Sequence, residues 1–559
     1  MSEGKTQSRP VRKQSSLYRS LWLSLVVLGS TGLLSTSGIE GNQVALSPEI
    51  APPPRPDPVA PWIDQEGSFD YAAALNAVLG RGVTPQNNAA VLIWQAIGPT
   101  PARGNPLPVE FFQYLGIPRP VASHEDFITS DRYFSEVLRL PEKAVLQLQD
   151  QLHLLMSLPW KEREAPELAA WLNRNEKALE LIRRATERPH YFTPAYRLND
   201  DGTTISLFNN LFPQGLAMRD VIRALDLRAM RKLGDGDVAG AWQDLLTTYQ
   251  LCRLLKRGTS IEVIIGAAGE RITFRTAKAF LEHASLTPRQ LAQCLEQLRQ
   301  LLESPSFLAH VMLCEMAGIL DYIQHKAPKN YVEAIGGIRE FFASPPPPLP
   351  RRLEDLPITQ EGWINLQREI ITHHLRWSDY FRQHRASRYD PQALEALDPS
   401  PQAVEELRRQ IEHEINMGRN KDGSDADQVV RLQLLASRYT AWVIVSDTKK
   451  YLPHWDEIYW HCRQCMELLQ VAFALELYRC EQGRYPEKLS QLADKYLSEV
   501  PPDRFRDHPL LYHVSPEFVL VYSVGRNGRD DAARSRLDDP NNDPGADDIV
   551  IRLRPRLKH

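Results

Sequence analysis

The stretch AFALELYRCEQGRYPEKLSQLADKYLSEVPPD at 472–503 predicts how the C-terminal part of this chain folds. It continues a pattern in which apolar residues recur at the spacing of one helical face: Met466, Leu469, Phe473 and Leu477. Gly483 stands where the end of a helix needs a left-handed residue, and Pro486 then prevents the helix from resuming. The pattern therefore predicts a long helix that ends at Gly483.

Three segments typical of β-strands follow this helix. LLYHV (510–514) and FVLVYSV (518–524) are separated only by Ser515-Pro516-Glu517, a link of hairpin length, and IVIRL (549–553) comes last. Three short strands are marginally stable alone and need a helix across one face. We therefore expect an α+β fold for this part of the chain, with a long helix and a small antiparallel sheet.

The order of these motifs resembles the C-terminal globular part of the major pseudopilin of type II secretion systems. In that family a long helix ends in a phrase similar to ALELYR-x-x-NGRYP. A Leu-Pro-x-Asp loop, a small antiparallel sheet and a Gly/Asp-rich calcium loop follow it. The resemblance covers about 455–553 and implies a pseudopilin-like α+β domain at 455–559. The matching residues are Ala474, Leu475, Leu477, Tyr478, Gly483, Arg484, Tyr485, Pro486, Pro502, Asp503, Tyr522, Ser523, Gly525, Asn527, Gly528, Asp547, Asp548 and Ile549.

The resemblance also implies a calcium site with ligands among Asn527, Asp547 and Asp548. Calcium takes six to eight oxygen ligands, and further carboxylates in the same stretch add candidates, first Asp530 and Asp531 and then Asp538, Asp539 and Asp543. The stretch is longer than in the family, and Ala532-Ala533 replaces its usual Gly pair. Arginines could instead neutralise the carboxylates: Arg526, Arg529, Arg534 and Arg536. A solvated polar loop without metal is therefore the alternative.

The chain departs from the pseudopilins ahead of the matching region. Those proteins begin with an apolar helix of about twenty residues that inserts into the membrane. Here charged residues interrupt the stretch 431–457: Arg431, Arg438, Asp447, Lys449 and Lys450. We therefore expect a pseudopilin-like module carried on another body, and not a subunit that polymerises into a pilus.

The N-terminus has the pattern of an export signal or membrane anchor, which we place at 1–38. Basic residues up to Arg19 precede the apolar run LWLSLVVLGSTGLL (21–34), and small residues follow it. A Pro-rich linker occupies 39–61. The pattern predicts an exported protein, either periplasmic or anchored to the cytoplasmic membrane by its N-terminus, with no other contact to the membrane.

The rest of the chain is predicted to be mainly helical, as a helical bundle or a solenoid-like body. It divides into a helical domain at 62–342, a second Pro-rich linker at 343–358 and a helical segment at 359–454. The hairpin 216–255 resembles one tetratricopeptide unit, but the chain has no clear 34-residue recurrence, so a plain helical hairpin is favoured. The segment 67–98 is similar to the start of large exported bacterial proteins of unknown function.

Composition excludes one class of partner. A net charge of −4 leaves no basic footprint for nucleic acid, so we expect protein partners in the cell envelope.

Chemical candidates in the body are sparse. His461-Cys462-x-x-Cys465 lies inside a predicted helix, where packed thiols are the ordinary outcome. Glu369, His373 and Glu412 are residue types found in catalytic sites, but no recognisable motif surrounds them. Two functions stay open: a non-enzymatic envelope protein with a helical scaffold and a pseudopilin-like, calcium-binding interaction module, or an uncharacterised envelope enzyme with its site in the helical body.

Overall fold

The computed structural model describes residues 68–100, 106–197, 207, 215–302, 307–339, 349–384, 390–418, 426–506, 508–535 and 545–554. The predicted export signal or membrane anchor (1–38) and the first Pro-rich linker (39–61) lie outside these residues. Residues 343–348 of the second linker (343–358) do so as well, whereas 349–358 are described. These three assignments stay predictions.

The described chain is mainly helical and carries a small antiparallel sheet near its C-terminus, as the sequence predicts. Short helices build its N-terminal part, and two of them form the pair expected within 67–98. The bounds are α2 (Tyr71–Leu79), α3 (Ala89–Ile97), α4 (Val109–Tyr114), α5 (Ser130–Arg132), the π-helical turn η2 (Tyr133–Val137), α6 (Glu142–Leu155), η3 (Glu162–Glu164), α7 (Pro166–Arg174) and α8 (Glu176–Thr186).

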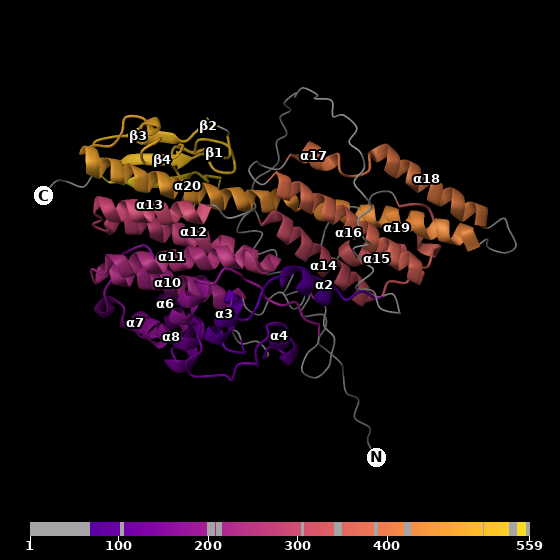
Figure 1. Cartoon of the computed structure of the whole chain (residues 1–559), viewed down its shortest axis with the longest axis horizontal. Coiled ribbons are helices and arrows are strands. Elements are labelled where there is room, and N and C mark those ends of the chain that lie inside the picture. Colours follow the sequence, from indigo (N-terminus) through magenta and orange to yellow (C-terminus); the bar gives the residue numbers. More distant parts are fainter. Residues whose placement is uncertain are drawn as a thin grey trace, which may run out of the picture.

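Longer helices form the rest of the body, and Figure 1 shows them lying side by side across the molecule. The two helices of the hairpin expected at 216–255 are confirmed. The bounds are α10 (Gly215–Gly234), α11 (Val238–Leu255), α12 (Ser260–His283), α13 (Pro288–Leu302), α14 (Leu308–Lys326), α15 (Tyr331–Arg339), η4 (Leu353–Asp355), α16 (Gln360–Gln383), α17 (Pro391–Glu395), α18 (Pro401–Gly418), α19 (Ala426–Lys449) and α20 (Leu452–Gln482).

Two helices are shorter than their apolar patterns suggest. The pattern over 136–158 predicts one helix, but α6 begins only at Glu142 because Pro141 stands at its N-cap. The pattern over 165–186 is interrupted at Asn175. The side chain of Asn175 accepts a hydrogen bond from the backbone N–H of Ile128 at 2.8 Å and donates one to its carbonyl at 3.0 Å. A contact across 47 residues therefore separates α7 from α8.

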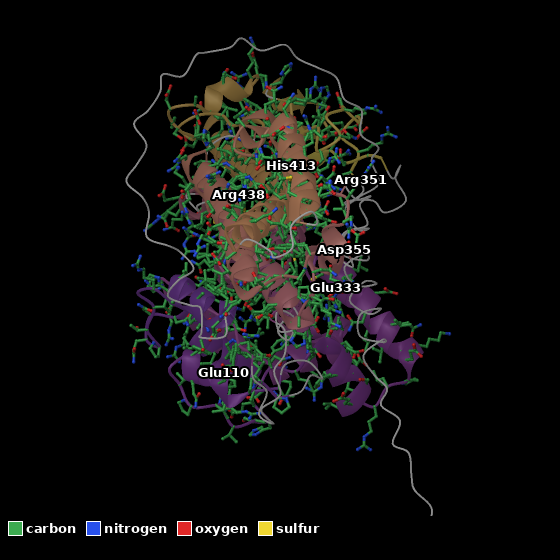
Figure 2. All side chains as sticks on the ribbon, turned by 90° about the vertical axis from the view of Figure 1, so that its right-hand side faces the viewer. Glu110, Glu333, Arg351, Asp355, His413 and Arg438 are labelled. Atoms are coloured by element: carbon green, nitrogen blue, oxygen red, sulfur yellow. The ribbon has the colours of Figure 1, made fainter. Side chains whose placement is uncertain are left out.

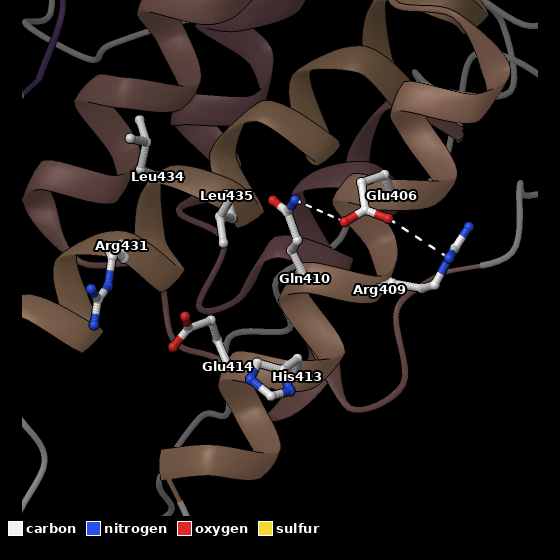
Figure 3. A pocket seen from close by; sticks show the side chains of 8 residues that line it. All are labelled: Glu406, Arg409, Gln410, His413, Glu414, Arg431, Leu434 and Leu435. Carbon is white, nitrogen blue, oxygen red and sulfur yellow. Dashed lines mark hydrogen bonds and ion pairs between the residues drawn. The ribbon is translucent and has the colours of Figure 1, made fainter.

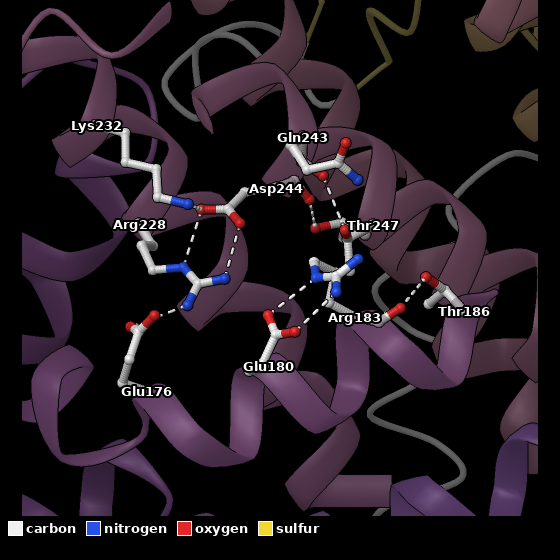
Figure 4. A network of polar contacts seen from close by, with 10 residues as sticks. Glu176, Glu180, Arg183, Thr186, Arg228, Lys232, Gln243, Asp244 and Thr247 are labelled. Atoms are coloured by element: carbon white, nitrogen blue, oxygen red, sulfur yellow. Dashed lines mark hydrogen bonds and ion pairs between the residues drawn. The ribbon is translucent and has the colours of Figure 1, made fainter. Parts of the chain in front are cut away.

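A buried ion network links α8, α10 and α11 (Figure 4). The carboxylate of Asp244, with 1% of its side chain exposed, accepts two hydrogen bonds from Arg228 at 2.8 and 2.9 Å. Lys232 lies 2.9 Å from the same carboxylate, and Arg228 also donates to Glu176 at 3.0 Å. Because every charge in it has a partner, the network joins the three helices without leaving a buried ion uncompensated.

The long helix predicted from 472–503 is confirmed. Its last residue is Gln482, and Gly483 caps it in the left-handed conformation (φ 72°) while donating to the Arg479 carbonyl at 2.9 Å. The single apolar face expected from the sequence is only part of what is buried, because nearly every side chain from 464 to 477 is excluded from solvent. The sheet covers one side of α20 and the helices α12 and α13 cover another (Figure 1).

The sheet has three antiparallel strands in the order β3-β4-β5. Their register pairs Val514 with Val519 at the hairpin, and Val521 with Ile551 in the centre. A short turn η5 and a two-stranded ribbon precede the sheet. The bounds are η5 (Leu489–Leu492), β1 (Pro502–Asp503), β2 (His508–Pro509), β3 (Leu511–Val514), β4 (Val519–Ser523) and β5 (Ile549–Leu553). The predicted hairpin and last strand are thus confirmed.

One apolar core extends from the N-terminal helices through α20 to β5. In it the Trp242 ring on α11 lies 5.4 Å from the Phe280 ring on α12 and 5.3 Å from the Phe473 ring on α20. The core therefore contains side chains from both sides of position 454/455, where the sequence places a domain boundary. That boundary and the other predicted domain ranges stay predictions. Among the described helices, none is both long and apolar enough to span a membrane.

Candidate functional site in the acidic turn

The predicted calcium ligands lie between β4 and β5, in a region that we call the acidic turn (residues 524–535 and 545–548). Gly525 has a φ of 68°, and a Cβ atom at this position would lie 2.1 Å from the carbonyl oxygen of Asp547. Only glycine allows this approach. The chain leaving β4 and the chain entering β5 are therefore in direct contact, and they bring the candidate ligands together.

Asp503 fixes the start of the acidic turn. Its buried carboxylate accepts hydrogen bonds at 2.8 Å from the Ser523 hydroxyl and from the Val524 backbone N–H. It also accepts from the Phe505 N–H at 3.0 Å. The Pro-x-Asp loop ahead of the sheet therefore holds the end of β4 in place, a role that the sequence pattern alone does not show.

Asp547 and Asp548 bind the opposite arm of the turn through its backbone. One oxygen of Asp547 accepts from the N–H groups of Arg526 and Asn527, at 2.9 and 3.1 Å. Both oxygens of Asp548, which is fully buried, lie within 3.3 Å of the Asp531 N–H. Each carboxylate thus satisfies backbone donors that would otherwise be unpaired.

The remaining candidates lie in the same turn. The Asn527 amide donates to the Asp531 carboxylate at 2.8 Å, and the Asp547 N–H donates to the same Asp531 oxygen at 3.1 Å. Asp530 accepts from the Tyr522 hydroxyl at 3.2 Å and from the Ala532 N–H at 2.9 Å. All five predicted ligands therefore lie in the acidic turn, although one carboxylate oxygen of Asp530 is already used by the turn itself.

Two carboxyl groups of the acidic turn are held in an unfavourable electrostatic environment. Burial, together with the smaller effect of the nearby charge of Asp531, raises the pKa of Asp547 to about 6 and that of Asp548 to about 7. The second oxygen of Asp547, Oδ1, is buried and accepts no hydrogen bond. The turn therefore contains negative charge that its own hydrogen bonds do not fully compensate.

These donors fit a hard cation best at Asp547. Oxygen donors are the ligands that calcium prefers, and Asp547 has an unpartnered carboxylate oxygen while its backbone N–H and its other oxygen contact Asp531 and Asn527. In the described ranges no three Asp, Glu, His or Cys side chains are grouped closely enough to hold a metal. Asp538, Asp539, Asp543 and Arg536 lie outside the described residues.

The candidate catalytic residues of the helical body engage in structural contacts. Glu369 on α16 forms an ion pair with Arg438 on α19 at 3.0 Å. Glu412 on α18 accepts from Arg408 at 2.7 Å and from the backbone of the second linker, at the N–H of Arg351, at 3.0 Å. His373 is buried in α16, and burial lowers its pKa. None of the described contacts brings Glu369, His373 and Glu412 to one point.

The Cys-x-x-Cys candidate lies within α20, as expected for packed thiols. Cys462 and Cys465 are buried thiols, and the Cys462 thiol contacts the Ala267 carbonyl on α12 at 3.7 Å. Burial raises the pKa of the Cys462 thiol well above its ordinary value. A thiol in this environment stays protonated and is a poor nucleophile.

The sequence reasoning did not find a second candidate surface, a cleft of about 550 Å³ between α18 and α19 (Figure 3). Charged residues of α18 form one wall, and the floor contains Leu434 and Leu435 of α19. The available signal was the closely spaced charge in EELRRQIEHE (405–414), which places several charged side chains on one face of a helix.

Comparison of this chain with protein-family models, with curated proteins and with solved structures gives no match.

Proposed function

We propose that this protein is a non-enzymatic, exported protein of the cell envelope. Its helical body is a scaffold, and its pseudopilin-like C-terminal part is an interaction module stabilised by calcium. The observation that carries the proposal is the arrangement around the acidic turn. Motif residues of the resemblance stand at the structural joints: Gly483 caps α20, Asp503 binds the end of β4, and Asp547 and Asp548 bridge the turn before β5.

Calcium would be held by Asp547, with Asn527 and Asp531 as further oxygen ligands. When bound, the ion supplies the positive charge that the buried carboxylates lack. Asp548 acts differently, because its oxygens bind a backbone N–H of the opposite arm and so keep the two arms together. The chain's own residues thus shape the turn, and the cation adds stability to the ionised form.

The exposed edge of the sheet supports a contact role for the module. Strand β3 forms one edge, and Val514 at its end is 45% exposed. The opposite edge, β5, lies against the body, where the Lys278 ammonium of α12 donates to the Val550 carbonyl at 3.1 Å. An exposed strand edge offers backbone groups to an added strand of a partner protein.

The ion pairs of Glu369 and Glu412 support the non-enzymatic assignment. Each of these carboxylates is bound to an arginine that links or stabilises helices. A general acid or base needs access to a substrate proton, which a carboxylate engaged in this way does not offer. We therefore assign both residues to the scaffold.

Export can be tested with a reporter enzyme that is active only outside the cytoplasm. Alkaline phosphatase is fused after residue 61, beyond the basic region and the apolar run, and a matched control carries the same reporter after residue 8. We expect activity from the first fusion and none from the second, in a bacterial host. An inactive reporter at both positions would contradict the proposed localisation.

The contact role can be tested with a photo-crosslinking amino acid placed at Val514 of the full chain. A matched control carries the same group at Leu146 on α6, which is 59% exposed. We expect one discrete cross-linked protein from position 514 and none from position 146. Equal labelling at both positions, or none at 514, would remove the support for the sheet as an interaction module.

A further inference from the structure

The cleft between α18 and α19 lies at the end of the molecule opposite the sheet (Figure 1). Figure 2 views the molecule from this end and labels His413 of α18 and Arg438 of α19 there. The cleft has its own chemistry. Part of its charge is neutralised within α18, because Arg409 lies 3.7 Å from Glu406 and Gln410 donates to Glu406 at 3.0 Å.

Two opposite charges in the cleft have no ion-pair partner among the described residues. Glu414 of α18 and Arg431 of α19 line the same cleft from facing helices, and neither of them forms a salt bridge. Figure 3 shows both side chains beside the apolar floor. The cleft therefore presents one carboxylate and one guanidinium without ion-pair partners, together with Leu434 and Leu435.

Exposed apolar side chains lie near the end of the helix pair, and Met417, four residues after His413, follows the face of α18 that lines the cleft. Met417 of α18 is 42% exposed, and Val429 and Val430 of α19 are 39% and 44% exposed. Large apolar residues that gather on one exposed surface, with charges at its rim, mark a protein contact more often than a bare solvent face. The polar rim and apolar centre have the anatomy of an interface.

The charges indicate which partner fits. In a twofold-symmetric dimer, a contact from one residue to a second residue of the other copy is always accompanied by the reverse contact. A surface that carries both a free acid and a free base can therefore pair with itself. Glu414 of one copy would face Arg431 of the other, and the reverse pair would form at the same time.

We propose that this chain forms a twofold-symmetric dimer through the α18–α19 cleft. Two reciprocal pairs between Glu414 and Arg431 set the register, and the apolar residues Leu434, Leu435 and Met417 are buried between the copies. This assembly is independent of the proposed role of the sheet, which lies at the other end of the molecule.

The size of the surface predicts a modest affinity. An 18-residue helix is about 27 Å long, and two helices side by side, each about 10 Å wide, give a face on the order of 500 Å² per copy. Two such faces bury roughly 1,000 Å², which is at the lower limit for a specific interface. We therefore expect an equilibrium between monomer and dimer at micromolar concentrations, and not a permanent dimer.

The test is sedimentation velocity of the full chain in detergent over a concentration series. The variants are Glu414→Arg, Arg431→Glu and the double exchange, and Lys143→Glu on α6 is a control for a charge reversal elsewhere. We expect each single exchange to weaken the dimer at least tenfold, because two like charges then face each other twice. The double exchange restores the pairs and the association, and Lys143→Glu leaves it unchanged.

Other results would overturn the proposal. If the chain stays monomeric at every concentration, the cleft does not mediate self-association, and any partner that binds there is a different protein. If neither single exchange changes the association, the contact between copies is made elsewhere, for example by the apolar run 21–34. Failure of the double exchange to restore the dimer excludes the reciprocal pairing. Thermal melts of all variants serve as folding controls, and we expect no change because Glu414 and Arg431 form no ion pairs with other described residues.

Discussion

The indole ring of Trp242 on α11 lies 5.3 Å from the phenyl ring of Phe473 on α20. This contact places α20, which carries the C-terminal sheet, in the same apolar core as the helical hairpin of the body. The resemblance suggests a domain carried on another body, but the two share buried side chains. The stability of the sheet is therefore coupled to that of the helices beneath it.

Replacing Phe473 with alanine tests this coupling. The side chain is fully buried, and its loss leaves a cavity beside Trp242, so we expect a cost of about 3–5 kcal/mol. Calorimetry should show one transition that includes α20, moved to lower temperature. The control Val514→Ala, at an exposed position of β3, should leave it unchanged. A separate low-temperature transition in Phe473→Ala, with the main one unmoved, would show that the module melts alone.

The ion network of Figure 4 offers a second test, by comparing a buried pair with an exposed one. Asp244→Ala leaves the Arg228 and Lys232 cations without their buried partner, so we expect a loss of about 3–5 kcal/mol. Glu180→Ala removes only the exposed pair with Arg183 and should cost less than about 1 kcal/mol. Urea unfolding measures both values. Equal costs would mean that burial of the network is not what stabilises it.

The carboxyl of Asp226 predicts a pH effect. It is fully buried between α10 and α12, where the hydroxyls of Thr273 and Thr276 donate to it, and burial raises its pKa from 3.8 to about 7. Because the folded pKa lies above the unfolded one, this group stabilises the fold below about pH 4, and that stability is lost as the pH rises through 7. The loss at pH 8 is on the order of 4 kcal/mol.

Asp226→Asn removes the titrating carboxyl group. The free energy of unfolding of this variant, relative to that of the parent, should therefore increase as the pH rises from 4 to 8. Urea unfolding of both proteins at each pH measures the difference. Val514→Ala provides the control, since a change at this exposed position, which carries no titratable group, should show a nearly constant difference over the same range. If the Asp226→Asn difference is also constant with pH, the buried carboxyl does not titrate as its environment indicates.

Local signals in the sequence were sufficient for the framework. Gly483 and Pro486 marked the end of α20, Ser515-Pro516-Glu517 marked the hairpin, and the apolar period over 238–255 gave α11 with its bounds as observed. Each of these features depends on residues close together in the chain. The approach of the five predicted ligands also followed from their positions at the two ends of one connection between strands.

Contacts between distant residues could not be predicted in this way. The interruption at Asn175 depends on Ile128, and the burial of α20 on two sides depends on α12 and α13. The sequence did not indicate that Asp547 and Asp548 would bind backbone N–H groups. The conformation of the closed turn decides which amides face these two carboxylates. The α18–α19 cleft was missed because its two walls come from separate helices.

The central claim is that the acidic turn binds calcium through Asp547. It is tested most directly by the melting temperature of the full chain at pH 7.5, with millimolar calcium and with chelator. We predict a rise of roughly 2–5 °C in calcium, because a ligand of the native state stabilises it by mass action. Magnesium should have little effect, since it dehydrates reluctantly and demands stricter geometry.

Two variants make this measurement specific. Asp547→Asn should lose the calcium response, because it removes the charge from the unpartnered oxygen. Asp530→Asn, in the same turn, should keep it, because Asp530 already binds Tyr522 and Ala532. A calcium-dependent rise in the parent and in Asp530→Asn, absent from Asp547→Asn, is the predicted result. No shift in the parent chain, or an equal shift in Asp547→Asn, would contradict the claim.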